Sequence, residues 1–218
     1  EVRQGALEGV MAEAVAKAAG VPPSEVRRAA MLAGELGSVA AAVLAEGSPG
    51  LSRFRLTVLR PVQPMLAQTA DGVEDALRRI SPAAIEWKLD GARIQVHRLE
   101  DEVRVFTRTL ADVTDRVPEI VEAVLALPVH AVILDGEAIA LRSDLRPHRF
   151  QVTMSRFGSR TEVERQRGSV PLSPFFFDAL HVDGEDLIDR PTRERVSALH
   201  ERTPEVMRVP RAIVEAPA

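Results

Sequence analysis

Apolar residues recur with two different spacings along this chain of 218 residues. Up to Glu46, proline-poor stretches rich in Ala, Val and Leu predict helices over residues 6–19, 24–34 and 36–45, the second capped by Ser24. The segment 47–50, Gly-Ser-Pro-Gly, is expected to break the third helix. Residues 54–59 are expected to be extended.

From Ile85 onward, apolar and polar residues alternate as they do in strands with one buried face. Asp90-Gly91 is predicted to form a tight turn between the first two strands, and residues 100–102 a second hairpin turn. Because few helices separate the strands, we expect an α+β fold with an antiparallel sheet. The predicted strands cover residues 85–89, 92–97, 103–107, 131–141 and 175–182, and further helices cover 117–127 and 190–202.

The change of pattern predicts two domains, a helical part at residues 1–54 and a sheet-containing part at 55–218. With 45% hydrophobic and 28% charged residues, the chain has enough apolar material for a core and is not disordered throughout. It contains no uninterrupted apolar run long enough to span a bilayer, so no membrane partner is expected. Since it also lacks cysteine and a secretion signal, a cytoplasmic protein is expected.

The 28 basic residues are all arginines except Lys17 and Lys88. A lysine can lose its proton and attack an electrophile, whereas arginine stays protonated. Lys17 lies in an Ala-rich predicted helix and fits a surface role. Lys88 lies beside the Asp90-Gly91 turn and Arg93, where an amine and a guanidinium on one side of a pocket would suit attack on a phosphorus. Taken alone, these residues leave an ordinary hairpin equally open.

The triplet Asp135-Gly136-Glu137 interrupts an apolar run. Carboxylates in a nearly buried strand are costly unless they are paired or bind a metal, so this triplet is interpreted as functional. Three other candidates have ordinary interpretations when each is taken alone. Arg108 and Glu86 fit solvated strand residues, and Phe177 fits a core position.

Residues 86–93, Glu-Trp-Lys-Leu-Asp-Gly-Ala-Arg, resemble the nucleotidyltransferase signature of ATP-dependent DNA ligases and mRNA-capping guanylyltransferases. The lysine of that signature forms a covalent phosphoramidate with the nucleotide. Three later segments resemble further elements of the family in the family's order, namely residues 106–108, 133–137 and 175–180.

The resemblance implies that Lys88 is the catalytic nucleophile, with ATP as the AMP donor, Mg²⁺ as the metal cofactor and nicked double-stranded DNA as the partner. It also implies nucleotide-binding roles for five further residues: Glu86 for the adenine amino group, Phe177 for stacking on the base, Arg93 and Arg108 for ribose or phosphate, and Glu137 for ribose or the metal.

The helical start and Pro64-Met65-Leu66-Ala67 resemble three-domain DNA ligases of the actinobacterial type, an arrangement that capping enzymes lack. By this resemblance, residues 1–54 are the last helices of a DNA-binding domain. Residues 55–218 are then a partial nucleotidyltransferase (adenylation) domain. The chain is expected to be truncated at both ends, without the later family elements and the OB-fold domain, and to be monomeric.

Two alternatives stay open. One is a GTP-dependent capping-type guanylyltransferase or an RNA ligase, and the other is a non-catalytic fragment that binds nucleotide or DNA. The arginine-rich stretch 141–170 fits a surface that faces DNA phosphates, although a solvated loop explains any single arginine there equally well.

Overall fold

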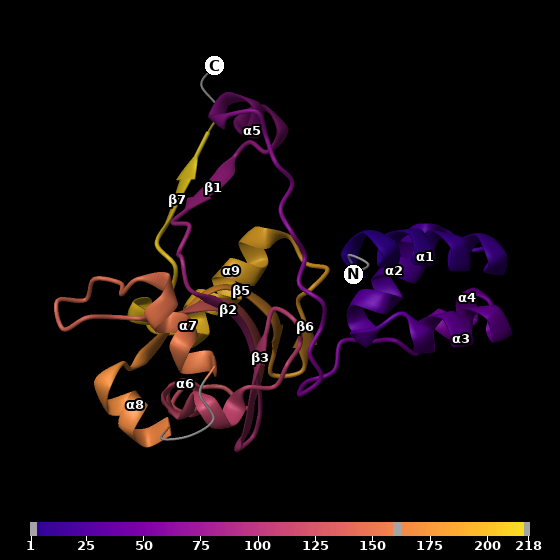
Figure 1. Ribbon diagram of the computed structural model, residues 1–218. Helices are drawn as coiled ribbons and strands as arrows, with labels where there is room; N and C mark the ends of the chain where they lie inside the picture. Colours follow the sequence, from indigo (N-terminus) through magenta and orange to yellow (C-terminus); the bar gives the residue numbers. More distant parts are fainter. Residues whose placement is uncertain (1–3, 159–162, 216–218) are drawn as a thin grey trace. The chain divides into compact units, whose positions relative to one another are not determined.

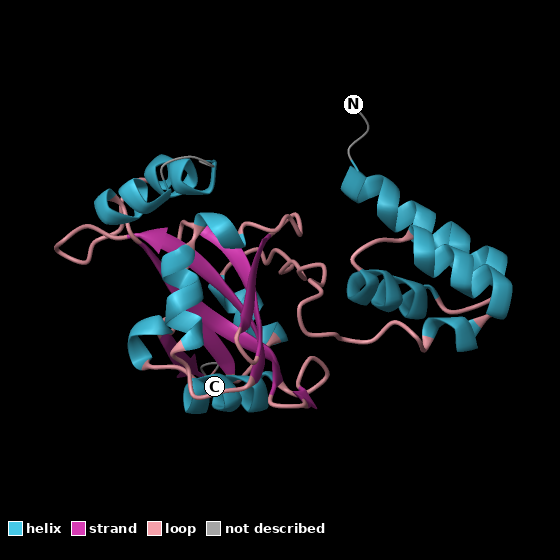
Figure 2. Ribbon diagram, turned by 90° about the horizontal axis from the view of Figure 1, so that it is seen from below, coloured by secondary structure: helices cyan, strands magenta, loops and turns pink. Residues whose placement is uncertain are grey.

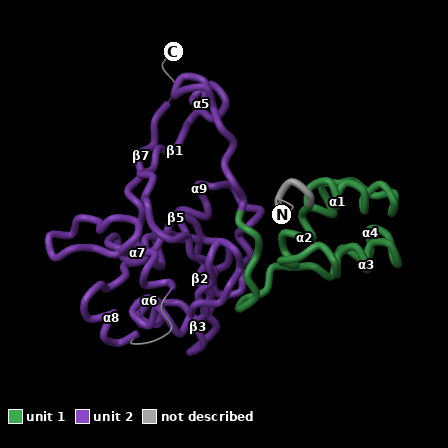
Figure 3. Tube along the Cα trace, in the orientation of Figure 1, with its two compact units in different colours: residues 1–64 green, residues 65–218 purple. Residues whose placement is uncertain are grey.

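The computed structural model describes residues 4–158 and 163–215. Two compact units, Glu1–Pro64 and Met65–Ala218, follow each other along the chain (Figure 3). Within the described residues, no helix has both the length and the apolar character needed to cross a membrane. The elements, most of them labelled in Figure 1, are α1 Gln4–Ala19, α2 Pro23–Ala33, α3 Gly37–Glu46, α4 Ser48–Leu51, α5 Val73–Arg79, β1 Ala83–Glu86, β2 Ala92–Leu99, β3 Glu102–Thr107, η1 Thr114–Arg116, α6 Pro118–Leu125, β4 Ala131–Ala140, α7 Phe150–Gly158, α8 Val163–Ser169, β5 Leu172–Val182, β6 Glu185–Asp186, α9 Thr192–Arg202, η2 Glu205–Met207 and β7 Arg211–Val214.

The first unit consists of the three predicted helices and a short fourth one. Small side chains let α1, α2 and α3 pack closely, with Ala16, Val26 and Val39 fully buried between them. The expected end of the third helix is confirmed, since Gly47 caps α3 with a φ of 66°. The short helix α4 that follows was not expected, and Pro49 fits its first turn. The expected cap by Ser24 is wrong, since Pro22 precedes α2 and no side chain caps it.

The segment after α4 belongs to the first unit by its contacts. Residues 54–59 form no strand, contrary to the expectation, and Leu59 turns the chain with a φ of 70°. Beyond them, Arg60 donates to the carbonyl of Ala33 at 3.1 Å, and the backbone N–H of Gln63 donates to Met31 at 3.0 Å. The units therefore divide after Pro64 rather than near residue 54.

The second unit is built on an antiparallel sheet with strand order β3-β2-β4-β5-β6, which confirms the expected α+β class (Figure 2). The predicted hairpin at residues 100–102 is present, with Leu99 opposite Glu102. Val96, Leu134 and Phe176 point from the sheet into the main core, where Ile120 of α6 and Leu199 of α9 complete the packing. Burial of such side chains is the main stabilising term.

The predicted hairpin at Asp90-Gly91 is wrong. Strand β1 pairs with β7 in a separate two-stranded sheet, so that Glu86 lies opposite Arg211, and the chain then crosses to β2 (Figure 1). Gly91 is needed for close approach rather than for a turn. A Cβ at this position would lie 2.3 Å from the carbonyl oxygen of Ala138 on β4.

Helices α5, α7 and α8 were not predicted. Phe150, Met154 and Phe157 recur at helical spacing, but the surrounding arginines and Pro147 obscure the pattern. The ion pair of Arg156 with Glu119, at 2.7 Å, ties α7 to α6 in the interior. This buried arginine therefore binds the protein itself and is not available to DNA phosphates.

The buried histidine of β2 makes the second unit sensitive to acid. The His97 side chain is fully buried, contacts Gln95 at 2.9 Å, and lies edge-on to Phe106. Burial, with a smaller effect of His181, lowers the pKa of His97 from 6.5 to about 3. Below pH 6.5 the unfolded chain therefore binds a proton that the folded state does not, and stability falls as the pH falls.

We predict that His97→Gln flattens this dependence. Wild-type protein should lose about 2 kcal/mol of unfolding free energy between about pH 7 and pH 5 through this one group, and the variant should not. Urea unfolding at both pH values measures the difference. Ile133→Val, which weakens packing opposite His97 without removing a titrating group, should keep the wild-type slope. Parallel pH profiles for wild type and His97→Gln would contradict the prediction.

Candidate active site

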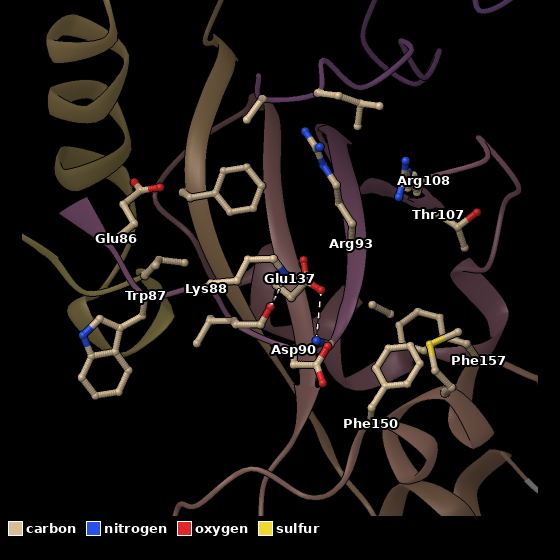
Figure 4. Close-up of a pocket in the computed structure, with 18 of the residues that line it drawn as sticks. Glu86, Trp87, Lys88, Asp90, Arg93, Thr107, Arg108, Glu137, Phe150 and Phe157 are labelled. Carbon is tan, nitrogen blue, oxygen red and sulfur yellow. Dashed lines mark hydrogen bonds between the residues drawn. The ribbon is translucent and has the colours of Figure 1, made fainter. Parts of the chain in front are cut away.

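A pocket of about 770 Å³ opens on the second unit, a volume in the range of small-molecule sites. Its walls come from the segment that joins β1 to β2, from strands β2, β4 and β5, from the end of β3, and from α7 (Figure 4). The lining contains all six residues that the sequence predicted for nucleotide binding: Glu86, Lys88, Arg93, Arg108, Glu137 and Phe177. The structure thus brings together residues from four separate segments, and their individual roles stay predictions.

Lys88 follows β1 and its side chain is exposed. Its Nζ donates to the carbonyl oxygen of Leu89 at 3.2 Å, and no described carboxylate forms an ion pair with it. Figure 4 shows the Lys88 side chain next to Glu137, within the pocket. The amine is therefore accessible to a ligand.

Glu137 projects from the central strand β4 into the pocket (Figure 4). Its Oε1 accepts a hydrogen bond from the backbone N–H of Gly91 at 3.1 Å. Burial raises the pKa of Glu137 above the ordinary value of 4.5, although the Gly91 hydrogen bond and the charge of Lys88 act against it. The carboxylate of Glu137 is thus held in place beside Lys88, although its partial burial costs solvation free energy.

Asp135, two residues before Glu137, is buried and binds the guanidinium of Arg93. Arg93 Nε lies 3.0 Å from Oδ1 of Asp135, and Nη2 lies 2.5 Å from Oδ2. Burial raises the pKa of Asp135, and the hydrogen bonds and charge of Arg93 oppose that rise. Arg93 also donates to the carbonyl of Met65 at 3.2 Å, so it fixes the start of this unit to the sheet. The sequence identified the carboxylate but not its partner.

A β-bulge directs Phe177 into the pocket. The register of β4 with β5 passes from Gly136 opposite Phe176 to Asp135 opposite Asp178, which leaves Phe177 unpaired. Phe176 stays in the core, while Phe177 lines the pocket. The Arg93 guanidinium lies 5.5 Å from the centre of the Phe177 ring, in a cation–π contact.

Glu86 forms an ion pair that the sequence did not indicate. Arg211 of β7 donates from Nε to Glu86 Oε1 at 2.6 Å, and its Nη2 contacts the same oxygen. Residues 86 and 211 are distant in the sequence, and only the pairing of β1 with β7 brings them together. The pocket also includes the exposed side chains of Trp87 and Phe150, for which no sequence pattern predicted a role.

The described residues contain no cluster of three or more His, Asp or Glu side chains arranged to hold a metal ion. Of the pocket carboxylates, Glu86 is paired with Arg211, whereas Asp90 and Glu137 form no ion pair with a described residue. Glu137 is the one that a strand and a backbone hydrogen bond hold in place. Magnesium is commonly held by one or two carboxylates together with phosphate oxygens and water. Glu137 therefore fits a metal that arrives with a phosphorylated ligand.

The sequence that forms this pocket is similar to those of known proteins. A family described as "ATP dependent DNA ligase domain" matches residues 64–214. A protein named "Probable DNA ligase" from Anaeromyxobacter sp. (strain Fw109-5) is 62% identical over 213 residues, which are 98% of this chain and 41% of that protein. Another of the same name from Mycobacterium sp. (strain KMS) is 61% identical over 216 residues, 99% of this chain and 41% of that protein.

The chain spans about two fifths of the length of these curated relatives. Among solved structures, the ligase domain of M. tuberculosis LigD aligns with a TM-score of 0.42 at 26% identity, over 54% of this chain and 36% of that chain.

Removal of Asp135 from its pair with Arg93 should destabilise the second unit. Asp135→Ala leaves the guanidinium of Arg93 without its buried partner, so we predict a loss of about 3 kcal/mol in unfolding free energy. Chemical denaturation measures it. Asp144→Ala removes the partner of an exposed pair with Arg146 and should leave stability unchanged. Equal effects of the two substitutions would contradict the prediction.

Proposed function

Because this chain belongs to the family of ATP-dependent DNA ligase domains, we propose that it carries the Lys88 nucleophile of an enzyme that seals nicks in double-stranded DNA. The observation that carries the proposal is the convergence of all six predicted residues on one pocket around an accessible lysine amine. The activity is proposed for the protein at its full natural length. The monomeric state and a cytoplasmic location belong to the same proposal.

The first step forms a phosphoramidate. The neutral amine of Lys88 attacks the α-phosphorus of ATP, an N–P bond forms, and the bond to the β-phosphate oxygen breaks. Pyrophosphate leaves, and the proton lost by the amine passes to solvent. An oxygen of the nick's 5′-phosphate then attacks the AMP phosphorus, the N–P bond breaks, and Lys88 is regenerated as an amine that takes up a proton from solvent. The 3′-hydroxyl next attacks the 5′-phosphate, its proton passes to solvent, and the phosphoanhydride bond breaks with release of AMP, which closes the strand.

The other pocket residues orient the nucleotide in this proposal. Glu86 accepts a hydrogen bond from the adenine amino group, and Phe177 stacks on the ring. Arg108, exposed at the end of β3, is free to approach phosphate or ribose. Arg93 is held by Asp135 and Met65, which suits a fixed contact to ribose or phosphate because little side-chain freedom is left to lose.

Glu137 would hold Mg²⁺ together with the nucleotide phosphates. The bound ion would supply positive charge that neutralises the phosphates during transfer. Glu137 is oriented for this by Gly91 and lies beside Lys88 in Figure 4. The exposed arginines of residues 141–149 would face the DNA backbone.

The family match favours ATP over GTP as the donor, and so favours a ligase over a capping-type guanylyltransferase. Intact mass of the protein at its full natural length, after incubation with ATP, GTP and Mg²⁺, tests the choice. We predict an AMP-sized increment on the wild-type protein and none on Lys88→Ala, because no other residue can replace the amine. A GMP-sized increment would support the capping alternative.

The chain contains its own control for this experiment, since Lys17 is the only other lysine. Lys17→Ala should take up AMP as fully as the wild type. Loss of the increment in Lys17→Ala, or its retention in Lys88→Ala, would show that the covalent site lies elsewhere. No increment on any variant, with nicked duplex still bound, would support the non-catalytic alternative.

Glu137→Gln should raise the stability of the fold at neutral pH and weaken ligand binding. Folding raises the pKa of Glu137 above its ordinary value of 4.5. The unfolding free energy therefore falls as the pH rises from that ordinary value through the raised pKa, because the folded state holds the proton more tightly. At neutral pH the ionised group destabilises the fold. The neutral isostere should therefore raise the melting temperature at about pH 7 and lose that advantage at about pH 4. The same variant should bind Mg²⁺ and ATP more weakly. A lower melting temperature at neutral pH would contradict the argument.

A further inference from the structure

Arg211 joins the two residues proposed to contact the base. Its Nε and Nη2 bind Oε1 of Glu86 on β1, and Nη2 also donates to the backbone carbonyl of Phe177 on β5 at 2.8 Å. One guanidinium thus connects β7, β1 and the bulged position of β5, which belong to two different sheets. Among the described residues, Glu86 lines the pocket and Arg211 does not.

The ion pair leaves Glu86 with one fixed oxygen and one available oxygen. Both contacts from Arg211 go to Oε1, and no described residue donates to Oε2. Glu86 keeps 34% of its side-chain exposure, whereas Arg211 keeps 11%. The mostly buried guanidinium of Arg211 therefore orients the carboxylate through Oε1. The second oxygen, Oε2, is available to accept a hydrogen bond from a ligand.

We propose that Arg211 is a positioning residue that selects adenine over guanine at this site, by fixing Glu86 at the edge of the base and Phe177 at its face. The proposal rests on the proposed function. Arg211 itself does not touch the nucleotide and acts only through these two neighbours.

The selectivity follows from the donor and acceptor pattern of the two bases. Adenine carries an amino donor at the position where guanine carries a carbonyl acceptor. A carboxylate oxygen held at that edge accepts from the amino group and repels the carbonyl. The discrimination depends on a fixed carboxylate, because a half-exposed glutamate that is free to rotate can move away from guanine and leave water between them.

The test compares ATP and GTP affinities by calorimetry in the protein at its full natural length. We predict that Arg211→Gln weakens ATP binding about tenfold and leaves GTP binding within about twofold, so that the preference for ATP shrinks about tenfold. Equal weakening for both nucleotides, or an unchanged ratio, would show a purely structural role and overturn the proposal.

Arg208→Gln is the matched control. Arg208 is a nearby arginine that donates to the carbonyl of Thr203 and does not contact Glu86. Its loss should lower the melting temperature without changing the ratio of ATP to GTP affinity. An equal change of that ratio in Arg208→Gln would also overturn the proposal.

A double-mutant cycle tests whether Arg211 acts through Glu86. In a Glu86→Gln background, Arg211→Gln should change the affinity ratio by less than about twofold, because the group that it positions is already altered. Full additivity would overturn the proposal. Intact mass of Arg211→Gln separates this inference from the proposed function. Covalent AMP that depends on Lys88, together with an unchanged ratio, would leave the ligase assignment standing and remove only the role of Arg211.

Discussion

The placement of a buried and a half-buried carboxylate on the central strand is the constraint around which the second unit is organised. Asp135 and Glu137 lie among apolar neighbours on β4, where an unpaired charge would be costly. Asp135 is compensated by the guanidinium of Arg93, and Glu137 by the backbone N–H of Gly91. Both compensating groups follow Lys88 closely in the chain. The interactions that make the carboxylates tolerable therefore also hold the lysine segment against the sheet.

Departures from regular structure create the site. The crossing from β1 to β2 takes the place of a hairpin, and it places Lys88 over β4 because Gly91 has no side chain to prevent close approach. The bulge in β5 turns Phe177 out of the core while Phe176 stays in it. A regular hairpin and a regular strand would have given a well-packed sheet with no pocket at this edge.

Much of the fold was accessible from the sequence, because local spacing carries the signal. The three helices of the first unit and strands β2, β3, β4 and β5 of the main sheet follow from periodicity, and its antiparallel class follows from the short connections between them. The two-residue strand β6 was not predicted. The errors occur where a distant contact overrides a local preference. Asp90-Gly91 has the composition of a hairpin turn, but β1 finds its partner in β7, and the arginine-rich surroundings of α7 hide a helix that is tied to α6 through Arg156.

Residue type and spacing alone identify the side chains with the chemistry: an isolated lysine five residues before an arginine, carboxylates inside an apolar strand, and an order of segments that resembles the ligases. These features are present in a chain before it folds. The pairing of the charges follows only from the folded arrangement. The contacts of Asp135 with Arg93 and of Glu86 with Arg211 depend on strand register between distant segments. Register is set by the packing of the whole sheet. No local pattern could therefore reveal that Arg211 orients Glu86.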